Sequence, residues 1–118
     1  KTVEAIKKAE ISFDDFMKME LQVGEVLSCE PVDGSKKLLC SQVQVSGRVL
    51  QIVSGIRKQY SPEDMVGKKV VVITNLAPAR LAGVESQGML LCAENSEGEL
   101  SLLTVDKPAD IEGGSFIS

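Results

Sequence analysis

The sequence predicts a mainly β domain, a five-stranded Greek-key barrel with a short helix between the third and fourth strands and N- and C-terminal extensions. Three observations predict it. Apolar, β-branched runs recur along the 118 residues, and Gly, Pro, Asn and Ser clusters typical of turns separate them. A clear helix start, Ser61-Pro62-Glu63-Asp64, falls between the third and fourth runs. The length suits one domain.

The first elements are a charged leader, a short helix and a strand. Residues 1–10 mix Lys and Glu with scattered apolar positions, which indicates a linker or leader ahead of a domain at 11–118. Ser12-Phe13-Asp14-Asp15 is typical of a helix N-terminus and predicts a helix through Met19. Leu21 to Cys29 alternates as a strand, and Gly24 marks a bend or bulge in it.

A hairpin and the short second helix follow. Leu38 to Val45 and Arg48 to Ser54 carry β-branched residues around Ser46-Gly47, which predicts two strands joined by a tight turn. The helix that begins at Ser61 is expected to end at Gly67 after little more than one turn.

The last third of the chain predicts three more strands. Lys68 to Leu76 is β-branched enough to be buried on both faces, and Pro78 must then leave the sheet because it cannot donate to a ladder. A loop follows, then a strand from Met89 to Ala93, a turn at Asn95–Gly98, and a terminal strand from Leu100 to Thr104.

The predicted order is three leading strands, a helix and two further strands, with the terminal strand in addition. The first five strands and the helix follow the order of an OB-fold, a small barrel that binds nucleic acids or oligosaccharides on one face. An SH3-like barrel is the alternative architecture.

Charge is unevenly distributed along the chain. The net charge is −4. From Lys36 to Arg80, however, there are eight cations and two acids, a net of +6, and the rest of the chain holds five cations and fifteen acids, a net of −10. One basic region on an acidic body can attract a polyanion locally. Random clustering of charges on a solvated surface is the alternative.

The sequence lacks the residues that several chemical functions require. The chain has no His, and its three cysteines (Cys29, Cys40 and Cys92) are widely spaced within strand-like runs, so we expect no metal site, no cofactor and no catalytic constellation. Free thiols fit a reducing cytoplasmic location. No run is long enough to suggest a membrane span.

The segment from Asn75 to Leu91 carries the most distinctive polar residues. This segment lies between two apolar runs and carries a cation, amide and hydroxyl side chains and a thioether. Because loops on a rigid sheet often bind ligands, it is a candidate binding loop. The few aromatic residues lie outside the basic strands, so base stacking is a poor source of binding energy and recognition of a folded, phosphate-rich surface fits better.

These residues resemble the tRNA-binding domain family, which includes the C-terminal appended domain of bacterial methionyl-tRNA synthetases, a free-standing tRNA-binding protein and an export-related chaperone. The likeness runs from about Ile11 to the C-terminus, and its most specific part is an N-L-x-P-x-R block followed by S-x-Q-G-M-L-L. Further matching segments are Phe13–Phe16, Leu21–Gly24, Gly34–Leu39, Val53–Ile56 and Val66–Lys68.

The resemblance implies an OB-fold that dimerises and binds tRNA by its tertiary shape. It implies a tRNA-binding face of Lys37, Ser54, Asn75, Arg80, Ser86 and Met89. Charge alone adds Arg57, Lys58, Lys68 and Lys69 at the periphery. Each polar residue could instead cap a strand end, and Met89 could belong to the barrel core.

We expect apolar residues of the two extensions to form a homodimer interface: Phe13, Phe16, Met17, Ile111, Phe116 and Ile117. The start at Lys1 and the charged leader favour a synthetase appendage, tethered to a catalytic core, over the free protein. The alternatives are a chaperone-like module that binds unfolded polypeptide and an unrecognised hydrolase, for which nucleophile and base are missing.

Overall fold

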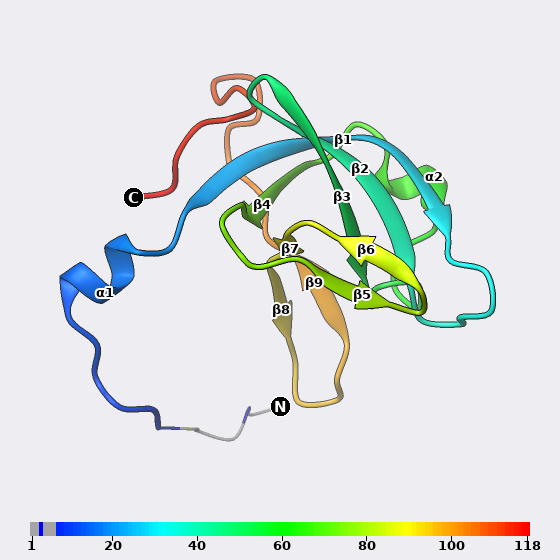
Figure 1. Ribbon diagram of the computed structural model, residues 1–118, viewed down its shortest axis with the longest axis horizontal. Helices are drawn as coiled ribbons and strands as arrows, with labels where there is room; N and C mark the ends of the chain where they lie inside the picture. Colours follow the sequence, from blue (N-terminus) through cyan, green and yellow to red (C-terminus); the bar gives the residue numbers. More distant parts are fainter. Residues whose placement is uncertain (1–2, 4–6) are drawn as a thin grey trace.

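The computed structural model describes residue 3 and residues 7–118, so much of the predicted 1–10 leader lies outside the described residues. Five antiparallel strands form one curled sheet in the order β3-β2-β1-β4-β7 (Figure 1). They are β1 (Leu21–Pro31), β2 (Leu39–Val45), β3 (Arg48–Ser54), β4 (Lys69–Ile73) and β7 (Met89–Leu90). Two small hairpins flank the sheet, β5 (Ala79–Leu81) with β6 (Val84–Ser86) and β8 (Cys92–Glu94) with β9 (Leu100–Leu102).

The sheet curls until its two outer strands meet. Gln87, between β6 and β7, donates its backbone N–H to the Gln51 carbonyl of β3 at 2.7 Å. Inside lies a core of buried aliphatic residues from β1, β2, β3 and β4, with Leu90 of β7 and Met65 of the second helix. The predicted OB-type barrel with a small helix is confirmed.

Both helix starts are as predicted. In α1 (Phe13–Met17) the Ser12 hydroxyl accepts from the Asp15 N–H, and in α2 (Pro62–Met65) Ser61 and Asp64 form a reciprocal capping box. The first helix ends at Met17 rather than Met19. It buries no residue and stands off the barrel (Figure 1), so no packing extends it.

Gly24 has a different role from the one predicted. The bulge in β1 lies between Val26 and Ser28, and it turns Leu27 outward, where it is 43% exposed. A Cβ at Gly24 would come within 2.5 Å of Val43 Cγ1, so this glycine allows β2 to approach closely.

The chain from 75 to 93 is more divided than predicted. The expected loop contains the β5–β6 hairpin, and the expected strand from Met89 to Ala93 is split between two partners. Met89 and Leu90 pair with β4, whereas Cys92 to Glu94 pair with β9. An uninterrupted apolar run carries no signal for a change of partner, because its residues have strand character whichever strand they pair with.

The C-terminal tail returns to the barrel. The Gly114 N–H donates to the Val23 carbonyl at 2.7 Å and the Ile117 N–H to the Leu21 carbonyl at 2.9 Å, so the tail covers the first part of β1 where β2 has ended. In the described residues no helix is both long and apolar enough to cross a bilayer.

Candidate nucleic-acid interface

Four exposed cations gather where two loops meet. Lys36 and Lys37 lie on the β1–β2 loop, and Arg57 and Lys58 follow β3. The backbone N–H of Arg57 donates to the Lys37 carbonyl at 3.1 Å, and its guanidinium donates to the Ser35 carbonyl. We call these four residues the cation cluster. Because these bonds cross-link the loops, the four positions lie close together in the fold, with Asp33 as the one acid on the β1–β2 loop.

The β1–β2 loop is itself ordered by local bonds. The Ser35 hydroxyl accepts from the N–H groups of Lys37 and Leu38, each at 3.2 Å, and Gly34 supplies the positive φ of 79° that the turn needs. A preformed cationic loop can meet phosphates without first being ordered.

Ser86 and Gln87 close the barrel. The buried Ser86 hydroxyl accepts from the Val53 N–H at 2.9 Å and donates to the Gly88 carbonyl at 3.0 Å. The Gln87 side chain accepts from the Gln51 N–H at 2.8 Å. Gly88 sits so tightly that a Cβ there would lie 2.9 Å from the Ile73 carbonyl oxygen. These side chains complete the hydrogen bonding of the edge of β3.

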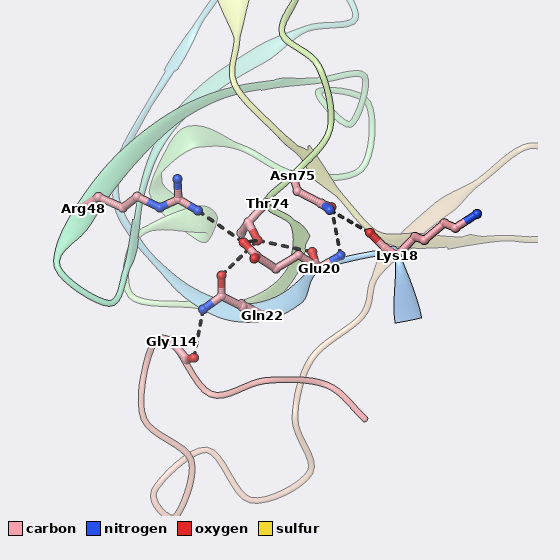
Figure 2. Close-up of polar contacts among 7 residues, drawn as sticks. All are labelled: Lys18, Glu20, Gln22, Arg48, Thr74, Asn75 and Gly114. Carbon is pink, nitrogen blue, oxygen red and sulfur yellow. Dashed lines mark hydrogen bonds and ion pairs between the residues drawn. The ribbon is translucent and has the colours of Figure 1, made fainter. Parts of the chain in front are cut away.

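Asn75 fastens α1 to the end of β4. Its amide oxygen accepts from the Glu20 N–H at 2.8 Å, and its amide nitrogen donates to the Lys18 carbonyl at 2.7 Å (Figure 2). Asn75 therefore caps a strand end in this structure, which is the alternative interpretation of this residue given above.

A polar cluster continues from Asn75 toward the C-terminal tail (Figure 2). The Thr74 hydroxyl lies 2.6 Å from Glu20 Oε1 and 2.9 Å from Gln22 Oε1. Gln22 donates to the Gly114 carbonyl at 3.1 Å, and Arg48 approaches Glu20 at 3.5 Å. These bonds join the start of β1, the end of β4, the C-terminal tail and the C-terminus of α1. They therefore fix the point where α1 leaves the barrel.

Arg80 lies on the exposed β5–β6 hairpin, opposite Glu85 of the paired strand. One guanidinium nitrogen donates to the Gly83 carbonyl of the hairpin turn at 2.7 Å. The cation is therefore presented to solvent in a restrained orientation.

Ser54 and Met89 border an apolar groove of about 450 Å³. Met89 is 44% exposed, so it is a surface residue of the groove and not part of the core. The Ser54 hydroxyl is buried without a hydrogen-bond partner among the described residues.

The peripheral lysines behave differently from one another. Lys68 lies over the Tyr60 ring, 5.8 Å from its centroid, and remains exposed. The Lys69 ammonium donates to the carbonyls of Pro108 and Ile111 and so holds the tail. Lys69 is thus half-buried and engaged within the chain.

The residues predicted for a dimer interface include three that are strongly exposed. Phe13 is 74%, Met17 61% and Phe116 70% exposed, while Phe16, Ile111 and Ile117 are half-buried. Large apolar side chains left in solvent on two extensions are typical of a surface that another molecule covers.

Two amides on the outer face of β2 and β3 were not predicted. Gln42 donates to Gln51 at 3.2 Å, and Gln51 donates to the Glu85 carbonyl at 2.8 Å, which links the sheet face to the hairpin that carries Arg80. Strand alternation could have found them, since Gln42 and Gln51 lie opposite the buried aliphatic positions.

The three cysteines are free thiols, each partly buried. Burial raises the pKa of the Cys29 thiol, although a hydrogen bond from Ser41 opposes the shift, and burial also raises the pKa of Cys40 and of Cys92. Within the described part of the chain, no group of three or more Cys, Asp and Glu could hold a metal ion.

A barrel of this strand order, with cations on the loop between its first two strands and on the hairpin before its last, defines an OB-fold domain, a class that binds oligonucleotides or oligosaccharides on one face. The family described as "Putative tRNA binding domain" matches residues 21–114, and the chain belongs to that family.

Curated relatives are methionine–tRNA ligases. That of Caldanaerobacter subterraneus subsp. tengcongensis is 53% identical over 108 residues, which cover 92% of this chain and 16% of the relative. That of Methanocaldococcus jannaschii is 53% identical over 114 residues, which cover 97% of this chain and 17% of the relative. The chain thus spans about a sixth of the length of these relatives.

Two solved structures show the same fold. A MetRS-related protein from Pyrococcus horikoshii is 35% identical with a TM-score of 0.88, covering 94% of this chain and all of that one. The chaperone CsaA from Bacillus anthracis is 27% identical with a TM-score of 0.83, and the match covers 93% of this chain and 100% of that one.

Proposed function

We propose that this domain binds folded tRNA by shape and backbone, without catalysis of its own, as the appended domain of a cytoplasmic methionyl-tRNA synthetase. The observation that supports it most is the cation cluster, fixed by backbone bonds on an OB-fold whose relatives are methionine–tRNA ligases. Tethered to a synthetase core, such a domain raises the local concentration of tRNA and so the apparent affinity.

The proposed face consists of two cationic parts. Lys37, with Arg57 and Lys58, neutralises phosphates on one side of the groove, and Arg80 contributes a further phosphate contact from the hairpin. Ser54 and Met89 lie between these parts. Asn75 and Ser86 act indirectly, Asn75 by holding α1 at the end of β4 and Ser86 by closing the barrel, since their polar atoms are engaged inside the chain. Lys68 and Lys69 are peripheral.

The test is a titration with folded tRNA and with the same tRNA denatured without magnesium, each across a salt series. Tighter binding of the folded form, with a steep loss of affinity as salt rises, is expected for recognition of shape through several phosphates. Equal binding of both forms would contradict recognition of shape, and no binding of either would contradict the function.

A chaperone activity is the second candidate, because the apolar groove could accept apolar side chains of an unfolded polypeptide and CsaA shares the fold. Binding of that kind is insensitive to salt and is competed by hydrophobic peptides. The same titration with a reduced, unfolded protein as ligand separates the two candidates.

We also propose that the domain forms a homodimer through the apolar residues of α1 and the tail. The exposure of Phe13 and Phe116 supports this. Sedimentation velocity should show a dimer that Phe13→Ser with Phe116→Ser converts to a folded monomer, whereas Leu103→Ser, at another exposed apolar position, leaves it intact. A monomeric wild type would contradict the proposal.

A further inference from the structure

The apolar groove lies directly beside the cation cluster. Ser54, Gly55 and Ile56 form one wall, and Arg57 follows immediately. We propose that the groove receives one unpaired, unstacked nucleobase of the bound RNA while the cation cluster holds a phosphate of that nucleotide. The inference rests on the proposed tRNA binding and adds where a single nucleotide is held.

The size of the groove suits one nucleoside. Ligand sites in proteins commonly measure about 300–1,000 Å³, and this groove of about 450 Å³ is near the lower end. Bases that have left a stack are the part of an RNA that proteins recognise individually.

The walls suit the flat face of a base. Leu76, Leu81 and Met89 line the groove and are each more than 40% exposed, at 47%, 41% and 44%. Stacking usually uses aromatic rings, but none lines this groove. The flexible, polarisable thioether of Met89 can instead lie against a base without fixing which base it is. Such a groove favours an unstacked nucleotide without reading its sequence.

The charges beside the groove select a nucleotide over a peptide. The cation cluster follows the Ser54–Ile56 wall, whereas the β8–β9 hairpin, whose Cys92 and Leu100 also line the groove, carries Glu94 and Glu99. An apolar peptide gains nothing from this asymmetry. A nucleotide has an apolar ring at one end and an anion at the other, so the field orients it with its phosphate toward Lys37 and Arg57.

The β5–β6 hairpin has two different faces. Ala79 and Leu81 line the groove, while the intervening Arg80 points to the opposite side, as strand alternation requires. The hairpin therefore offers an apolar underside to a base and a cation on its outer side to a neighbouring phosphate.

Filling the groove tests the inference. Ala79→Phe should lower the affinity for folded tRNA by about tenfold, because the phenyl ring fills the space that the base needs and the apolar contacts of the base are lost. It should leave the salt dependence unchanged because no phosphate contact is removed. The matched control is Ala93→Phe, at an exposed position of β8 that does not line the groove, and it should bind as the wild type does. Wild-type affinity in Ala79→Phe would overturn the inference while leaving tRNA binding intact.

A measurement on the unaltered protein guards against misfolding of the variant. The Met89 methyl NMR signal should shift when a short unstructured RNA is added and stay in place with an abasic ribose-phosphate oligomer of equal length. A shift with both oligomers, or only with an apolar peptide, would overturn the inference. Failure of the wild type to bind any tRNA would instead refute the proposed function itself.

Discussion

Two regions at the groove differ in how they use their polar groups. In the 54–61 loop and the 32–38 loop bonded to it, the backbone together with the Ser35 and Arg57 side chains makes the internal bonds, and the Lys37 side chain stays in solvent. In the 74–88 segment, the polar side chains make the internal bonds, and Asn75, Ser86 and Gln87 all serve the barrel or α1. The segment with the more specific motif is thus the one with fewer groups free for a ligand. A distinctive pattern can encode closure of a barrel as readily as contact with RNA.

The largest expected effect is on stability at Gly88. Gly88→Ala places a methyl group 2.9 Å from the Ile73 carbonyl oxygen, a backbone atom that cannot move aside. The free energy of unfolding should fall by about 2–3 kcal/mol, measured by urea denaturation. Gly47→Ala, where nothing lies within 4 Å of the added Cβ, is the control. Equal stability of the two variants would show that the motif is not needed for closure.

A smaller loss is expected at Ser86. Ser86→Ala leaves the Val53 N–H at the barrel seam without its partner, which should cost about 1–2 kcal/mol. The affinity of the remaining folded protein for tRNA should not change. Ser101→Ala, at an exposed position of β9, controls for loss of a hydroxyl. If Ser86→Ala instead lost affinity at full stability, its hydroxyl would contact RNA and the contrast between the regions would fail.

Lys37 tests the other region. Lys37→Ala should leave stability within about 0.5 kcal/mol of wild type, because an exposed side chain is removed. The slope of log affinity against log salt should become shallower by about 1, the share of one phosphate contact. Lys107→Ala removes an exposed cation from the C-terminal tail and should leave the slope unchanged. An unaltered slope in Lys37→Ala would remove the cation cluster from the interface.

The barrel could be predicted because the local sequence signals for helices and turns agree with the pattern of buried apolar residues. Helix caps at Ser12 and Ser61, the turn at Ser46-Gly47 and the β-branched run of β4 each depend on neighbours in the sequence. The β5–β6 hairpin was missed because its strands have three residues each, too few for a period to be read.

The site is harder to predict than the fold for a physical reason. A side chain such as that of Ser86 or Asn75 can bond to RNA or to its own backbone, and the sequence does not show which partner the fold brings near. Lys37 carries no such ambiguity, because its exposed ammonium has few ways to be satisfied inside a small barrel. Charge therefore indicates an exposed position such as Lys37 more directly than the motif does, although Lys69, chosen on charge, is half-buried and bonded to the tail.

The smallest expected effect is at Arg80, and it decides how far the two regions differ. Its guanidinium already donates to the Gly83 carbonyl and faces Glu85 across the hairpin, so part of its charge and hydrogen bonding is engaged before RNA arrives. Arg80→Ala should weaken tRNA binding without unfolding the domain, and it should change the salt slope by less than Lys37→Ala does. Because the two cations lie on separate loops, the double variant should show the sum of the single losses. A loss in Arg80→Ala that equals or exceeds that of Lys37→Ala would mean that the hairpin, despite its internal bonds, presents the stronger phosphate contact, and the motif segment would then both close the barrel and bind the RNA.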